Sequence, residues 1–161
     1  MSTASRSQVM SAILALIQNM AFSQPINGAS TWLTGPGDKG NPTVPAKLRL
    51  WADVPVDQQP AAFLVTHREL DEYRGLGLLR RRLELGVWCY SRSDNTPGGE
   101  QLDTMMQAFE QAFCTIDNPS SGSNTLGGLV YFCRIEGKVF KDPGDLDNQT
   151  LLIVPLVIEM P

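Results

Sequence analysis

The chain has 161 residues, 42% hydrophobic and 19% charged, proportions typical of one globular domain that can bury a core. The net charge of −4 argues against a general nucleic-acid-binding protein, which needs a basic face to displace phosphate counterions. No apolar run approaches the roughly 18 residues that would span a bilayer, so we expect no membrane association. The three cysteines, Cys89, Cys114 and Cys133, show no CxxC spacing; we expect a reducing compartment without disulfides or a zinc site.

Charge is unevenly distributed along the chain. Residues 1–93 hold ten Lys and Arg and seven Asp and Glu, whereas residues 94–161 hold three and ten, so the two parts carry +3 and −7. This asymmetry is typical of surfaces that meet oppositely charged neighbours, of a face that must not bind DNA, and also of solvated acidic loops.

The first part of the chain predicts one helix and a long loop. Residues 7–20 carry apolar side chains at spacings of three and four, which predicts an amphipathic helix. The stretch 27–59 is rich in Gly and Pro, so we predict an irregular loop of a length that usually serves a function. Because this loop carries Trp32 and Trp51, we expect these rings to cover either the protein's own sheet or a neighbouring chain.

The middle of the chain predicts two strands and a second helix. Residues 61–66 form a buried strand, residues 67–77 a polar loop, and residues 82–90 a strand whose alternation places one face on the core. The other face of that strand ends in Trp88 and Tyr90, so it is not simply solvated. Residues 100–113 carry one apolar stripe and predict a helix.

The last third predicts an antiparallel hairpin. Strands at 129–140 and 151–158 flank a turn rich in Gly, Pro, Asp and Asn. The order of elements is helix, strand, strand, helix, strand, strand. We therefore predict a single α+β domain, with a four-stranded antiparallel sheet that packs both helices on one face.

The final strand is apolar on both faces and has Pro155 in its middle. Proline cannot donate to a β-ladder, so its position predicts an edge strand or a bulge. An edge strand that is apolar on both faces needs a cover. Either the long loop or another subunit can supply it.

The sequence offers no arrangement of residues that predicts catalysis. His67 is the only histidine, and no G-x-S-x-G elbow presents a nucleophile. The acidic turn at 142–148 lacks the order of a calcium loop, and the Gly-rich stretch at 35–40 lacks the P-loop pattern. We expect no catalytic, cofactor or metal site and do not expect an enzyme.

Three consecutive arginines precede the second strand. Neighbours in a regular strand point to opposite faces, so the three cannot form one patch. They mark either the solvated start of a strand or a surface that pairs with acidic groups of an adjacent subunit. With the apolar candidates, we predict a subunit interface that includes Arg80, Arg81, Arg82, Trp88, Tyr90, Trp32, Trp51, Leu152, Val154 and Leu156.

Seven stretches, in this order after an opening amphipathic helix, resemble one family. They are LWADV at 50–54, QPAAF at 59–63, RLELGVWCY at 82–90, LD at 102–103, NTLGG at 124–128, CRIEG at 133–137 and DPGDL at 142–146. The ordered combination, which covers nearly the whole chain, resembles the tail terminator (tail-completion) proteins of tailed bacteriophages.

The resemblance implies a structural virion protein, made in the cytoplasm of a host bacterium and located at the head–tail junction. Such a protein forms a hexameric ring that caps the tail tube, ends its polymerisation and joins the tail to the head connector. DNA passes through the lumen. Its partners are the tail tube protein, the neck or connector protein and, as a further candidate, the sheath. The family implies no catalytic residues.

Two other functions are open on the sequence alone. A head-completion or neck adaptor protein would form its ring on the connector side of the joint. A small α+β hydrolase or ligand-binding domain would depend on His67, and substitution of that residue would abolish its activity.

Overall fold

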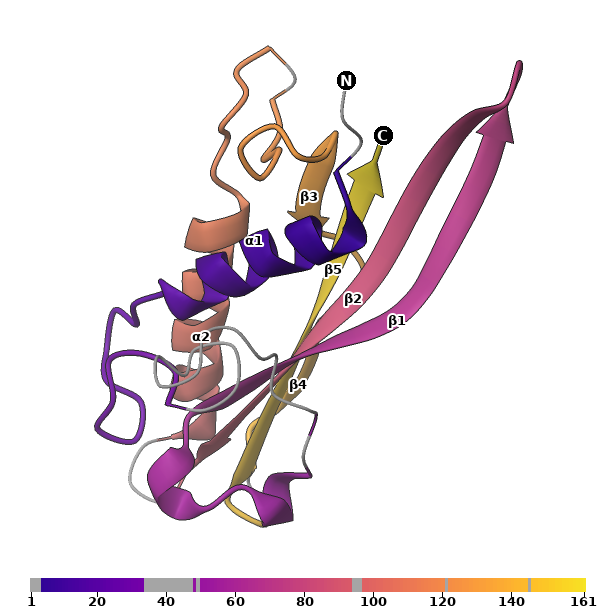
Figure 1. The fold of residues 1–161 in the computed structure, drawn as a ribbon. Helices are drawn as coiled ribbons and strands as arrows, with labels where there is room; N and C mark the ends of the chain where they lie inside the picture. The colour runs from indigo at the N-terminus through magenta and orange to yellow at the C-terminus, as the bar shows by residue number, and fades with distance from the viewer. Residues whose placement is uncertain (1–3, 34–47, 49, 94–96, 121, 145) are drawn as a thin grey trace.

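A computed structural model describes residues 4–33, 48, 50–93, 97–120, 122–144 and 146–161, without the side chains of Arg74 and Leu78. The fold is α+β and has two helices on one face of an antiparallel sheet (Figure 1). In chain order the elements are α1 (Arg6–Gln18), η2 (Trp51–Asp53), η3 (Val56–Gln58), β1 (Ala61–Arg74), β2 (Leu78–Arg92), α2 (Gly98–Phe113), β3 (Phe132–Ile135), β4 (Phe140–Asp142) and β5 (Gln149–Met160).

The helix predicted at 7–20 is α1, and a capping box fixes its start. The Ser5 hydroxyl accepts a hydrogen bond from the backbone N–H of Gln8 (3.2 Å), and the Gln8 side chain accepts one from the N–H of Ser5 (2.8 Å). This reciprocal pair satisfies two of the amides that a helix start leaves open. The apolar stripe of α1 then buries Val9, Ile13 and Ile17.

The helix predicted at 100–113 is α2, which begins two residues earlier. Its apolar stripe buries Leu102, Met105, Phe109 and Phe113 in the same core cluster that receives α1. The two helices therefore cover one face of the sheet, as predicted, and we refer to the opposite face as the outer face (Figure 1).

The sheet has five strands in the order β1-β2-β5-β3, with β4 also paired to β5. The strand predicted at 129–140 is split into β3 and β4, which pair with different parts of β5. The split lies opposite Pro155, whose carbonyl oxygen accepts a bond from the N–H of Glu136 (3.3 Å). The N–H that proline lacks would point to the same side, so no regular ladder can continue there.

The prediction that β5 is an edge strand is wrong, because β5 pairs with β2 on one side and with β3 and β4 on the other. β5 has no bulge at Pro155 in its ladder with β2, which stays in register there; the interruption lies in the neighbouring chain, between β3 and β4. The strand is apolar on both faces because both are covered. Leu152, Val154 and Leu156 lie under the helices, and Leu151 packs in a second cluster on the outer face.

The polar loop predicted at 67–77 is wrong as well. Strand β1 continues to Arg74 and β2 begins at Leu78, so most of this stretch belongs to a long two-stranded ribbon. A tight turn joins them, in which Gly75, Leu76 and Gly77 all have positive φ angles (43°, 45° and 78°). A shift of register between Thr66 and Arg68 leaves His67 as an extra residue where the ribbon leaves the body. We call residues 67–80 the arm (Figure 1).

Candidate assembly surfaces

The arm extends away from the two-layer body (Figure 1). It ends in exposed apolar side chains. Leu76 at the apex is fully exposed, and Tyr73 beside it is 78% exposed. Nothing in the described part of the chain covers Leu76. Leu70, on the outer face of the arm, is 52% exposed. A cluster of exposed apolar groups at the end of a projection is typical of a surface that another chain covers.

The base of the arm is fixed to the first turn of α1 by ion pairs. Arg6 Nε donates to Glu69 Oε2 (2.8 Å), and Arg81 Nε lies 2.9 Å from both Glu69 Oε1 and Asp71 Oδ1. The hydrogen bond from Arg6 is the main cause of a lowered pKa of Glu69. These ion pairs hold the base of the arm on the side of α1.

The three consecutive arginines point to both faces of the sheet, as predicted. Arg81 lies on the side of α1, whereas Arg80 and Arg82 lie on the outer face. Arg80 pairs with Glu159 (2.8 Å), and Arg82 pairs with Glu136 (3.0 Å). Each arginine thus has a carboxylate partner within its own chain.

Glu136 accepts hydrogen bonds from two arginines. Arg134 Nε lies 2.6 Å from one carboxylate oxygen and Arg82 lies 3.0 Å from the other. These bonds, that from Arg134 first, lower the pKa of Glu136. The part of the outer face next to the arm therefore carries charges that are paired within the chain and is not a basic patch.

The part of the outer face that lies away from the arm is apolar, and the chain covers some of it. Phe63 and Tyr90 form a buried cluster with Val54 and Ala61, against which Leu48, Trp51, Trp88 and Leu151 pack. The sequence left two candidates for the cover of this face, the long loop or another subunit. For this part of the face the cover is the segment of the loop that contains η2 and η3. The middle of that loop, residues 34–47, lies outside the described residues.

Four of the predicted interface residues lie in the core, so their assignment to a subunit interface is wrong. Leu152, Val154 and Leu156 are fully buried beneath the helices, and Trp32 is 2% exposed. The Trp32 ring packs edge-on against Phe22, with ring centroids 4.9 Å apart. Apolar pattern alone cannot separate a covered interior strand from an assembly surface. Tyr90 is buried on the outer face, while the arginines, Trp51 and Trp88 retain partial exposure.

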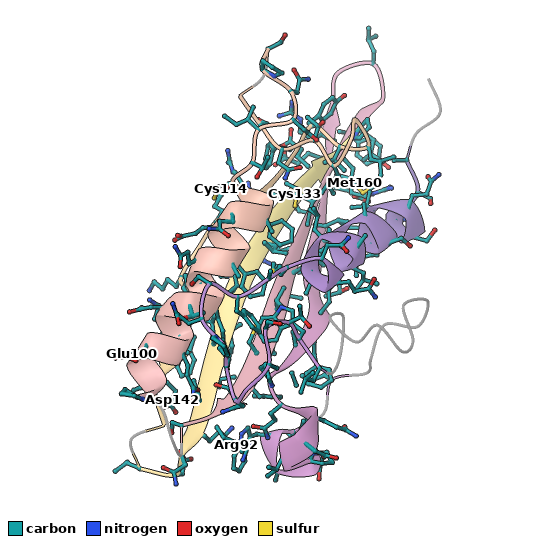
Figure 2. All side chains as sticks on the ribbon, turned by 90° about the vertical axis from the view of Figure 1, so that its left-hand side faces the viewer. Arg92, Glu100, Cys114, Cys133, Asp142 and Met160 are labelled. Carbon is teal, nitrogen blue, oxygen red and sulfur yellow. The ribbon has the colours of Figure 1, made fainter. Side chains whose placement is uncertain are left out.

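A groove between the two helices was not predicted. It encloses about 720 Å³ and is lined by the C-terminal halves of α1 and α2 and by the loop that follows α2. The two helices contribute four alanines to its walls, Ala12 and Ala15 from α1 and Ala108 and Ala112 from α2. Figure 2 looks onto both helices, and the groove lies between them. The signal in the sequence was the pair of alanines at helical spacing on each helix.

A carboxylate holds the loop at one end of this groove in place. Asp117 accepts hydrogen bonds from the backbone N–H of Thr125 (2.6 Å), the hydroxyl of Thr125 (2.8 Å) and the N–H of Gly127 (2.8 Å). Loss of solvation would raise the pKa of Asp117, but these bonds outweigh it, and the pKa is lowered. The groove therefore has a fixed end wall.

His67 lies at the base of the arm, and its side chain packs over Gly86 on the outer face. Within the described ranges, no group of three or more His, Cys, Asp or Glu side chains is arranged to hold a metal ion. Neither helix of the described chain is long and apolar enough to cross a membrane.

Comparison with known proteins identifies no relative, so a function has to be inferred from the fold and its surfaces. No protein-family model matches the chain, and no curated protein matches it.

Proposed function

We propose that this protein is a phage tail terminator, a structural protein that assembles into a ring at the end of the tail tube and joins the tail to the head connector. The observation that carries the proposal is the arm, whose apolar end has no cover within the described chain. A projection of this kind gains stability only when another chain removes Leu76 and Tyr73 from water.

The geometry favours a ring over a two-fold dimer. The arm extends beyond the body (Figure 1), while the groove lies between α1 and α2. Contacts between two different surfaces repeat from one copy to the next, and they form a ring when the rotation closes. The order of sequence stretches described above supports the tail terminator among ring-forming proteins.

Charge also supports this role. Residues 93–128, which include α2, contain five carboxylates and no Lys or Arg. A channel wall of this composition would repel the phosphates of passing DNA and keep the duplex from adhering.

The test measures assembly and location separately. Native mass spectrometry and negative-stain imaging of the purified protein should show rings of one stoichiometry. Antibody labelling of disrupted virions should then mark the head-proximal end of separated tails. A strict monomer at all concentrations that is also absent from virions would overturn the proposal. Label on tailless heads instead would assign the protein to the connector side.

A further inference from the structure

We propose that the end of the arm of one copy occupies the groove between α1 and α2 of the next copy. The inference rests on the proposed function in one respect, that the protein forms a ring. It adds which two surfaces meet.

The end of the arm is shaped as an apolar insert. Tyr73 and Leu79 are cross-strand partners, and Leu76 stands beyond them at the apex. The ladder runs without a break from Arg68 to Arg74, so the arm is a ribbon rather than a loose loop. At about 3.3 Å per residue, the four residues between Leu76 and Arg80 carry the apex roughly 13 Å past the ion pair of Arg80 with Glu159. The insert can thus reach a neighbour without unfolding.

The groove has the dimensions and chemistry to receive that insert. Its volume of about 720 Å³ is large enough for several apolar side chains, and alanine walls leave room for them. Leu16 and Leu126 add larger apolar groups. Asn19, Gln111 and Thr115 provide polar atoms around the apolar wall, suited to the polar edges of a hairpin turn.

The insert and the groove match in polarity rather than in net charge. The arm, residues 67–80, holds three arginines and three carboxylates, so its net charge is zero. The groove lining contains one carboxylate, that of Asp117, which already accepts hydrogen bonds from Thr125 and Gly127, and its other residues are uncharged. An apolar insert can therefore enter this apolar groove without leaving the carboxylate of its end wall unpaired.

The two surfaces belong to different parts of one chain, so the contact is head-to-tail. Each copy gives one arm and receives one arm. The number of such contacts in a closed ring therefore equals the number of copies.

Crosslinking tests the contact directly. We would combine Leu76→Cys with Gln111→Cys in a Cys114→Ser background and treat the assembled protein with a short bismaleimide. Leu76 and Gln111 are exposed, and the remaining cysteines, Cys89 and Cys133, are buried. The expected product is a ladder of covalent oligomers that ends at the size of the ring. The matched control is Leu146→Cys with Gln111→Cys in the same background, because Leu146 is as exposed as Leu76 but lies in another loop.

A second pair of variants tests the groove. Ala15→Trp fills it and should weaken ring assembly by at least about tenfold. Ser11→Trp, one turn earlier on α1 and outside the groove lining, should leave assembly unchanged.

The outcomes separate this inference from the proposed function. Rings that yield no ladder, or that tolerate Ala15→Trp, would overturn the arm-in-groove contact and leave the ring intact. An equal ladder in the Leu146→Cys control would also overturn it, since that result reports random collision. A protein that is monomeric before any substitution would overturn the proposed ring itself.

Discussion

The backbone of Gly98, the first residue of α2, lies directly against the main-chain carbonyl of Pro143 in the turn after β4. A β carbon on Gly98 would overlap that oxygen. Close by, Gln101 accepts a hydrogen bond from the Ser91 hydroxyl (2.6 Å) and donates one to the Arg92 carbonyl (2.6 Å). The start of α2 is therefore fixed to both β2 and the chain that leads to β5.

Gly98→Ala should lower the free energy of unfolding by about 1–3 kcal/mol, because backbone atoms would have to move to admit the methyl group. Gly99→Ala is the matched control. Apart from its chain neighbours and its own helix backbone, no atom of the described residues lies within 4 Å of the site of its β carbon, and alanine favours a helix by up to about 1 kcal/mol over glycine. Urea unfolding of the two variants measures the contrast. Equal effects would contradict the close approach of Gly98 to Pro143.

The position of Leu156 in the core gives a second prediction. Leu156→Ala should lower the free energy of unfolding by about 2–5 kcal/mol, because the side chain is fully buried beneath the helices. Leu146→Ala, at a fully exposed leucine, should change stability by less than about 0.5 kcal/mol. A small effect of Leu156→Ala on folding with a large effect on assembly would return Leu156 to the subunit interface.

The loop after α2 should make stability depend on pH through Asp117. The pKa of Asp117 is lower in the folded protein than its ordinary value of 3.8. Its contribution is therefore present above about pH 4 and is lost as pH falls through the folded pKa. The stability difference between the wild type and Asp117→Asn should be largest at neutral pH and shrink toward pH 3. Asp57→Asn, at an exposed carboxylate in η3, is the control. A difference in unfolding free energy between the wild type and Asp117→Asn that does not change with pH would contradict the prediction.

Thiol labelling should distinguish the three cysteines. Burial raises the pKa of the Cys133 thiol to about 12, and full burial raises that of Cys89 well above its ordinary value. Cys114 is exposed at the end of α2 (Figure 2). The native protein should therefore react with one equivalent of a maleimide at pH 7, at Cys114, and the unfolded protein with three. Fast labelling of Cys133 in the native protein would place β3 outside the core.

The elements that the sequence predicts best are those with a buried stripe. Both helices were found because Ile13 and Phe109 recur with neighbours at helical spacing. The arm was missed for the converse reason. A ribbon that contacts no core has no need to alternate apolar with polar residues, and the stretch around Glu69 and Asp71 therefore looked like a loop.

Other features depend on contacts that no local pattern contains. The split between β3 and β4 is caused by Pro155, which lies in a different strand. The groove depends on how α1 and α2 approach one another, so Ala15 and Ala112 acquire a role only once the helices are placed. Residues such as Val154 were assigned to an interface because a strand covered on both faces within the chain and a strand that binds another subunit are equally rich in apolar residues.

The place of β5 in the sheet has a consequence during synthesis on the ribosome. β1 and β2 are neighbours in sequence and can pair early, but β2, β3 and β4 find their shared partner only when β5 has been made. Until then the inner edge of β2 stays unpaired, with Leu83, Leu85 and Val87 near it lacking their native cover. The nascent chain is thus most prone to aggregate along the edge that is best protected in the finished protein.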